Sequence, residues 1–214
     1  MTNVALLHYS APPIVGGVES VLGYHARLMA DAGHQVRIVA ARGEQTDPRI
    51  PFIHVPLTDS RHPEILELKT ELDRGHIPSG FDELVTPLTA HLNEALEGVD
   101  VLIAHNVCSL NKNLALTAAV RNLANNKRPR IVLWHHDLAW TTPRYRAELH
   151  DGYPWDLLRQ AWPGVKQVTI SEMRQHELAE LFQINREEIA VVPNGVDVPR
   201  FHKLEKQTTE YLKQ

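Results

Sequence analysis

The sequence has very little cysteine and no long hydrophobic run. Cys108 is the single cysteine among 214 residues, so no disulfide can form within the chain, as expected in a reducing compartment. No stretch approaches the ~18 consecutive apolar residues of a membrane span. The opening residues, MTNVALLHYS, lack the basic start and long apolar run of a secretory signal. We therefore expect a cytoplasmic protein without a transmembrane segment.

An excess of basic residues is also absent. The chain has 22 lysines and arginines against 26 aspartates and glutamates, and its net charge is −4 with histidines neutral. Such a chain has no overall positive field to attract nucleic acid or anionic lipid, so we expect no nucleic-acid partner. With 43% hydrophobic residues, the chain can bury a sizeable core.

Several common catalytic motifs are missing. No G-x-G-x-x-G fingerprint occurs, and Ala40-Ala41-Arg42 stands where a dinucleotide-binding domain would have its acidic residue. This disfavours a nicotinamide- or flavin-dependent oxidoreductase or epimerase. No cysteine and histidine cluster has the spacing of a metal site, and no G-x-S-x-G elbow is present. We therefore expect neither a metal ion nor a cofactor.

Short apolar segments alternate with segments of helical periodicity along the chain. We expect strands near residues 4–8, 35–41, 52–55, 99–105, 130–135, 167–170 and 189–192, and helices near 18–32, 63–74, 81–97, 111–125, 155–161 and 171–182, with a long loop at 136–154. This alternation predicts an α/β fold, a Rossmann-like doubly wound parallel sheet with helices on both faces. Residues 1–199 would form one domain, and residues 200–214 a connector and the start of a helix.

Polar residues follow several of the predicted strands. His105 and Asn106 end one strand, and His135, His136 and Asp137 end the next. Because ligands of open α/β sheets bind outside the carboxyl ends of the strands, these residues form a candidate site. For any one of these histidines, a hydrogen-bonded role in the core is the alternative interpretation.

A glycine pair, Gly16 and Gly17, follows the first predicted strand and opens a helix. Glycine allows a ligand to approach the backbone closely, and the amides of a helix N-terminus attract phosphate or carboxylate groups. A phosphate-binding loop and a simple tight turn both fit this pattern.

The order of five short motifs resembles the N-terminal, acceptor-side domain of family 4 retaining glycosyltransferases, which have the two-domain GT-B fold. The motifs are Gly16-Gly17-Val18-Glu19, Leu28 to Val36, His135-His136-Asp137, Ile170-Ser171-Glu172 and Val192-Pro193-Asn194-Gly195-Val196-Asp197, and Phe201 also fits. Each motif is weak alone, but the five occur in order, and the match as a whole spans residues 4 to 201.

The resemblance implies retaining transfer of a hexose from a nucleotide sugar. Gly16, Gly17 and Glu19 would lie near the donor diphosphate, and His136, with His135 as the second candidate, would hydrogen-bond the donor sugar. Further candidates for lining the cleft are His105, Asn106, Asp137, Ser171, Glu172, Asn194 and Gly195.

The R-x4-K-G and E-x7-E motifs of the donor-binding domain do not follow Gly195. A chain without that cationic clamp should be nearly inactive alone, so we expect a C-terminal GT-B domain to join it in cis or in trans. The nucleotide sugar would bind only with that domain. This hypothesis predicts an exposed apolar edge around residues 193–201 and beside the glycine loop, which favours self-association.

The acceptor would be a sugar or a sugar phosphate. Candidate residues for binding it are Lys112, Arg144, Arg146 and Trp140. The cations could equally form a solvated surface, and Trp140 could simply attach its loop to the core. The alternative function is a non-catalytic sugar- or partner-binding module that kept the glycosyltransferase fold, so whether the chain itself is an enzyme stays open.

Overall fold

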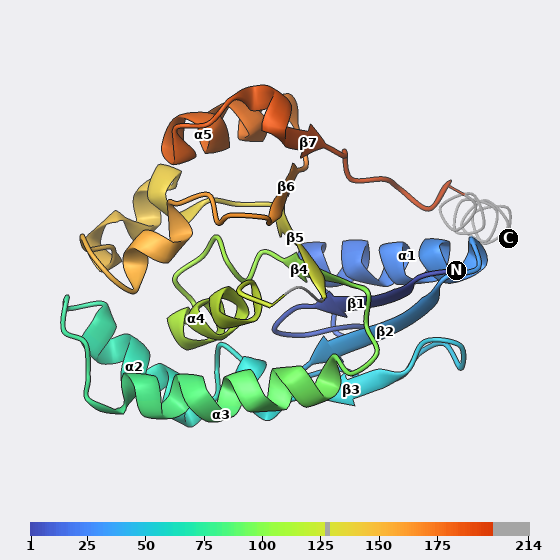
Figure 1. Ribbon diagram of the computed structural model, residues 1–214, viewed down its shortest axis with the longest axis horizontal. Coiled ribbons are helices and arrows are strands. Elements are labelled where there is room, and N and C mark those ends of the chain that lie inside the picture. The colour runs from blue at the N-terminus through green and yellow to red at the C-terminus, as the bar shows by residue number, and fades with distance from the viewer. Residues whose placement is uncertain (127–128, 199–214) are drawn as a thin grey trace, which may run out of the picture.

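The computed structural model describes residues 1–126 and 129–198, which include a seven-stranded sheet (Figure 1). The strands are β1 (Asn3–Leu7), β2 (Gln35–Ala40), β3 (Phe52–His54), β4 (Val101–His105), β5 (Arg130–His135), β6 (Lys166–Thr169) and β7 (Ile189–Val191). Their order in the sheet is β3-β2-β1-β4-β5-β6-β7, and every neighbouring pair is parallel. The predicted fold class is confirmed.

The helices lie close to their predicted positions. They are α1 (Gly17–Asp31), α2 (Pro63–Leu72), α3 (Gly80–Ala95), α4 (Leu114–Leu123) and α5 (Glu172–Phe182). After α1 the chain passes through Gly33 at φ +85°, the left-handed conformation that favours glycine at a helix end. Helix α4 begins later than predicted because the Asn113 side chain accepts a hydrogen bond from the Leu116 amide and caps the helix.

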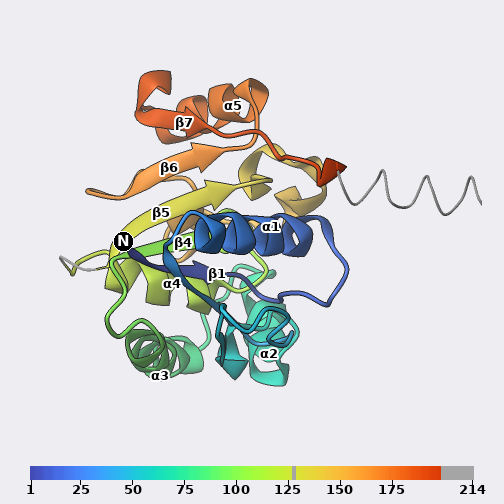
Figure 2. The same ribbon diagram turned by 90° about the vertical axis from the view of Figure 1, so that its right-hand side faces the viewer.

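Alternate side chains of the central strands pack on opposite faces of the sheet. On β1, Val4 and Leu6 join the core beneath α1, whereas Ala5 and Leu7 join the larger core beneath α2, α3 and α4. Figure 2 shows α1 separated by the sheet from α3 and α4. Because both faces are covered, the strands are apolar on both sides, as in other parallel sheets.

The chain changes direction in the sheet between β1 and β4. It moves from β1 outward to β2 and β3, then returns through α2 and α3 to β4 on the other side of β1. The carboxyl ends of β1 and β4 therefore form a topological switch point, the position where such sheets bind ligands.

Two predicted segments differ from the structure. The loop at 136–154 contains 3₁₀ turns, η2 (Ala139–Thr141) and η3 (Pro143–Glu148), and the helix at 155–161 is the 3₁₀ turn η4 (Trp155–Leu158). The other short turns are η1 (Pro56–Thr58) and η5 (Arg186–Glu188). Prolines begin η1 and η3, where their fixed φ suits a first turn and the missing amide has no partner within the turn.

The predicted connector at residues 200–214, with Phe201, lies outside the described residues. Within the described part of the chain, the helices fall short of the length and apolar character that a bilayer crossing requires.

Candidate functional site

Three histidines from three neighbouring strands meet at the carboxyl edge of the sheet, on the side of α1. His8 follows β1, His105 ends β4 and His136 follows β5. The Nδ1 atom of His8 lies 2.7 Å from the carbonyl oxygen of His105, and the Nδ1 atom of His105 lies 3.3 Å from Nε2 of His136. We call these three residues the histidine edge. The histidine edge lies at the carboxyl ends of β1 and β4, where the chain changes direction in the sheet, and it extends to the end of β5.

Asn106 fixes the backbone beside the histidine edge. Its Oδ1 atom accepts hydrogen bonds from the amides of His136 and Asp137, both at 3.0 Å, and from the Ser109 hydroxyl at 3.0 Å. Its own backbone has φ +58°, a left-handed conformation that asparagine tolerates better than most residues. The carboxyl ends of β4 and β5 are thereby joined through one buried side chain.

Burial keeps the histidine edge uncharged at neutral pH. It lowers the pKa of His8 and of His136 to about 4, and it also holds the pKa of His105 well below the usual value. The His105 ring stacks on Trp134 with centroids 5.3 Å apart, and His25 of α1 lies 5.3 Å from His105 on another side. Neutral imidazoles can donate and accept hydrogen bonds at once, which suits a hydroxyl-rich ligand.

The glycine loop lies next to this cluster. Gly16 has φ −171°, an extended backbone, so the left-handed freedom of glycine is not used there. A Cβ atom on Gly16 would collide with the Glu19 carboxylate, whereas one on Gly17 would meet nothing within 4 Å. The surface over Gly17 is therefore open to an approaching group.

Glu19 connects the loop to the histidine edge. Its Oε1 atom accepts a 2.6 Å hydrogen bond from the Ser10 hydroxyl and lies 3.9 Å from Nε2 of His8. Burial raises the pKa of Glu19, but the hydrogen bonds from Ser10 and from its own amide, with His8 and Arg42 nearby, outweigh burial and lower it overall. A carboxylate thus stands at the N-terminus of α1, where the helix dipole favours negative charge.

His135 points away from the histidine edge. Its Nε2 atom lies 2.8 Å from Oε1 of Gln167 on β6, and its ring meets Phe182 of α5 edge to face. Neighbouring residues at a strand end point to opposite faces, so His135 and His136 cannot share one environment.

The other predicted cleft residues lie at varied distances from this cluster. Asp137 has one carboxylate oxygen 3.6 Å from the Arg174 guanidinium. The Ser171 hydroxyl accepts from the Arg174 amide and so caps α5, as its sequence position indicates. Glu172, Asn194 and Gly195 are exposed.

The predicted acceptor residues divide into two groups. Lys112 is half-buried, and burial and the nearby Arg144 lower its pKa. Asp137 and Glu19 act in the opposite direction, so the ammonium group of Lys112 lies within the electrostatic field of the candidate site. Arg144 and Arg146 are exposed, and Arg144 donates to its neighbour Tyr145. Trp140 instead packs beneath the Arg159 guanidinium, 4.1 Å from its ring centre, and donates to the carbonyl of Trp155 at 3.4 Å.

Residues that sequence reasoning missed include His8, Ser10 and His25. His8 carries the same signal as His105, a histidine directly after an apolar strand, so the strand-end argument could have found it. His25 offers no such signal, since it occupies an ordinary helical position. Of the residues that the structure describes, no group of three or more His, Cys, Asp or Glu side chains is placed to hold a metal ion.

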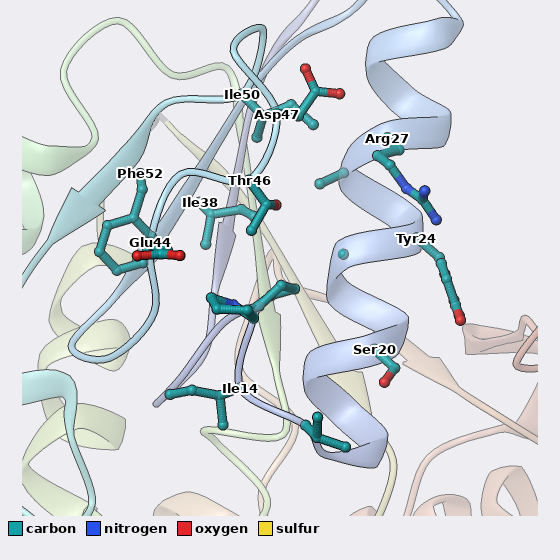
Figure 3. Close-up of a pocket in the computed structure, with 15 residues that line it drawn as sticks. Ile14, Ser20, Tyr24, Arg27, Ile38, Glu44, Thr46, Asp47, Ile50 and Phe52 are labelled. Carbon is teal, nitrogen blue, oxygen red and sulfur yellow. The ribbon is translucent and has the colours of Figure 1, made fainter.

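A cavity of about 620 Å³ lies beside α1, away from the histidines (Figure 3). It opens between α1 and residues 44–52, because the β2–β3 connection is a loop where a doubly wound fold usually has a helix. Its walls are mainly apolar, with Ile14, Ile38 and Phe52 among them, and Arg27 at its rim lies 3.3 Å from Asp197. The sequence offered no sign of this cavity.

The sheet order, the switch point between β1 and β4 and the glycine loop define this chain as one Rossmann-like half of a GT-B fold. The family model described as Glycosyltransferase Family 4 matches residues 15–200. The chain therefore belongs to glycosyltransferase family 4, and the resemblance of its motifs is confirmed.

Two curated relatives are glycosyltransferases. The chain is 28% identical over 206 residues to mannosylglucosylglycerate synthase of Thermotoga maritima, covering 91% of this chain and 45% of that protein. It is 25% identical over 230 residues to the MMP alpha-(1->4)-mannosyltransferase of Mycolicibacterium hassiacum, covering 95% of this chain and 54% of that protein. The chain thus spans about half the length of the curated relatives it matches.

Solved structures agree on the fold. WaaG, a glycosyltransferase involved in lipopolysaccharide biosynthesis, superposes with a TM-score of 0.54 at 16% identity, over 90% of this chain and 45% of WaaG. The UDP-GlcNAc 2-epimerase of Neisseria meningitidis gives a TM-score of 0.51 at 13% identity, over 99% of this chain and 51% of the epimerase. Because an epimerase shares this fold, architecture alone does not identify the reaction.

Proposed function

We propose that this chain is the acceptor-binding half of a retaining glycosyltransferase that transfers a hexose from a nucleotide sugar. The donor nucleotide would be held mainly by a second GT-B domain, joined in cis or in trans. The single observation that carries this proposal is the family match to residues 15–200 in a chain that covers about half of each relative. The names of both relatives include a mannosyl group, which supports a hexose as the transferred sugar.

The histidine edge supports the proposed role of His136. Its Nε2 atom contacts His105, while no described residue hydrogen-bonds to its Nδ1 atom. A sugar hydroxyl at the carboxyl edge of the sheet would therefore find an imidazole nitrogen already positioned by Asn106 and His105. Positioned donors and acceptors of this kind stabilise a transition state because they need no reorganisation during the reaction.

The open surface over Gly17 supports the approach of the donor diphosphate. A side chain at this position would meet nothing in the chain, so glycine is not required by internal packing. The Glu19 carboxylate occupies the Gly16 side of the same helix N-terminus. A diphosphate would therefore approach over Gly17, near the helix amides and away from that negative charge.

Apolar side chains are exposed where a second domain would close. Val15 beside the glycine loop is 96% exposed, and Val196 and Val198 are 64% and 54% exposed. These exposures agree with the predicted apolar edge, and a covering domain or a second copy of the chain would bury the three side chains.

For the acceptor, we favour an anionic sugar such as a sugar acid or a sugar phosphate. Lys112 lies in the combined field of Arg144 and Arg61, which repel it, and of Asp137 and Glu19, which attract it. Neither an ion pair nor a hydrogen bond occupies its ammonium group among the residues that the structure describes, so it is available to a phosphate or carboxylate.

Calorimetric titration of the chain with UDP-, GDP- and ADP-hexoses tests the proposal. We expect no saturable binding, since the donor domain is the main nucleotide site, and we expect weak binding of anionic sugars that Lys112→Met abolishes. The tryptophan near-UV spectrum serves as the control that both proteins are folded. Tight binding of one nucleotide sugar, or sugar transfer by this chain alone, would contradict the half-site proposal.

A further inference from the structure

The hydrogen bond between the rings of His105 and His136 requires one hydrogen between their two nitrogen atoms. Two neutral imidazole nitrogens 3.3 Å apart form a hydrogen bond only if one carries the hydrogen and the other offers its lone pair. The structure therefore allows two arrangements. Either His105 donates from Nδ1 to Nε2 of His136, or His136 donates from Nε2 to Nδ1 of His105.

The second nitrogen of His105 distinguishes these arrangements. Its Nε2 atom is fully buried and has no hydrogen-bond partner. If His136 were the donor, the hydrogen of neutral His105 would be on Nε2, leaving a buried N–H group unpaired. An unpaired buried donor or acceptor costs about 1–3 kcal/mol, and orphaned N–H groups are the rarer of the two in native proteins. If His105 is the donor, its buried Nε2 atom carries an unpaired lone pair in place of an unpaired N–H group, which is the more common arrangement.

The surroundings prevent His105 from relieving this constraint by turning. Its ring is stacked on Trp134 at an interplanar angle of 29°. Its carbonyl oxygen accepts a hydrogen bond at 2.7 Å from Nδ1 of His8, which fixes the hydrogen of His8 on that nitrogen. Both the plane of the ring and the backbone behind it are therefore held in place.

We propose that His105 is a positioning residue that fixes His136 in the tautomer with its hydrogen on Nδ1. His136 then carries an N–H donor, not a lone pair, at Nδ1, the ring nitrogen that does not contact His105. Free histidine favours the opposite tautomer, with hydrogen on Nε2, so the protein reverses the intrinsic preference. The role of that donor toward a sugar oxygen rests on the proposed function, whereas the tautomer itself does not.

Nitrogen-15 NMR of the uniformly labelled chain at pH 7.5 tests the proposal directly. Long-range correlations from the ring carbon-bound hydrogens report which imidazole nitrogen is protonated. For His136 we expect a protonated Nδ1 and a bare Nε2, with the same pattern for His105. Protonation of His136 on Nε2, or signals averaged between the two forms, would overturn the proposal.

Two variants of His105 add a matched comparison. His105→Asn keeps an N–H donor at the place of Nδ1, and it should leave His136 protonated on Nδ1. His105→Leu removes the donor at similar volume, and the proton of His136 should move to Nε2. An unchanged tautomer in His105→Leu would overturn the proposal; if that variant does not fold, the spectrum of the natural chain still decides.

Sugar transfer gives a separate outcome. In a transferase that contains this chain, His105→Leu should lower kcat at least 10-fold while His105→Asn retains most of it. If the NMR result holds and both variants transfer sugar at the natural rate, the positioning role stands, and the proposed role of His136 in the reaction is wrong.

Discussion

The histidine edge differs sharply from a second polar cluster, formed by Lys69, Asn111 and Glu148 on the opposite side of the sheet. In that cluster the Glu148 carboxylate accepts hydrogen bonds from Lys69 at 2.9 Å and from Asn111 at 2.7 Å, and Lys69 also pairs with Asp73. Opposite charges are matched within the chain. At the histidine edge, by contrast, the three rings are neutral, and the buried Nε2 atom of His105 has no hydrogen-bond partner among the described residues.

This difference separates a structural role from a functional one. Lys69 and Glu148 join α2 to the 3₁₀ segment η3 and need nothing further from a ligand. Oδ1 of Asn111 is also buried without a hydrogen-bond partner among the described residues, so the two clusters differ in their charges and not in the pairing of every polar atom. Neutral imidazoles at the end of a strand can instead hydrogen-bond a ligand. We therefore expect changes at the histidine edge to affect sugar transfer, and changes at the Glu148 cluster to affect stability alone.

The largest expected effect comes from removing His136. In a transferase that contains this chain, His136→Ala should lower kcat by ~10²–10³, the usual loss for one positioned group that stabilises the transition state. His135→Ala should lower kcat less than 10-fold but reduce the free energy of unfolding by about 2 kcal/mol, because it loses packing against Phe182 and its bond to Gln167.

Steady-state kinetics and urea unfolding of the same two proteins measure both quantities. The reverse pattern, with the larger loss of kcat in His135→Ala, would move the candidate catalytic role to His135. Equal effects would mean that the two faces of the β5 end are not functionally distinct.

Asn106 should have the next largest effect. Asn106→Ala removes the acceptor of two buried amides and one hydroxyl, and we expect it to reduce the free energy of unfolding by about 3 kcal/mol or more. Asn106→Gly loses the same acceptor but tolerates φ +58°, so it should be roughly 1 kcal/mol more stable than the alanine variant. Urea titrations of the three proteins provide the measurement, and a loss below about 1 kcal/mol in both variants would show that water replaces the Oδ1 atom.

The sequence predicts the fold far better than it predicts these contacts. Apolar runs such as Val4 to Leu7, and glycines such as Gly33, report on local packing and backbone conformation, so strands and helices follow from short segments. The strand-end argument also identified His105 and His136. It could not separate His136 from His135, because that distinction depends on which face of β5 each side chain reaches.

Contacts between distant segments are what the sequence does not predict. Trp140 is a candidate for binding the acceptor, and only the structure shows that the Arg159 guanidinium lies 4.1 Å from its ring centre. The cavity beside α1 exists because residues 44–52 form a loop, and no local pattern reports what a loop leaves uncovered. Side-chain partners far apart in the sequence are decided by tertiary packing, which local periodicity does not encode.

The stability of the protein should fall at acid pH because its histidines are buried in the neutral form. Burial lowers the pKa of His8, His135 and His136 to about 4, from an ordinary value of 6.5. Between these values the unfolded chain binds more protons than the folded one, so stability falls as the pH drops from about 6.5 to about 4. We expect a loss on the order of 1–3 kcal/mol for each histidine, measured by urea unfolding at stepped pH values above 4.5, where most carboxylates still carry charge. A flat profile would mean that water reaches these rings in the folded state.

Substitutions of Glu148 should have the smallest effect. They test whether the cluster of Lys69, Asn111 and Glu148 has a structural role alone. Its side chain is 35% exposed, so solvent and salt screen its attraction to Lys69. Glu148→Ala should reduce the free energy of unfolding by about 1 kcal/mol, and Glu148→Gln, which can still accept from Asn111, by less. Both losses should shrink in 1 M salt, with kcat unchanged. If Glu148→Gln instead lowers kcat 10-fold or more at full stability, the charge-matched cluster belongs to the site, and the distinction between charge-matched and neutral polar groups fails as a guide to function.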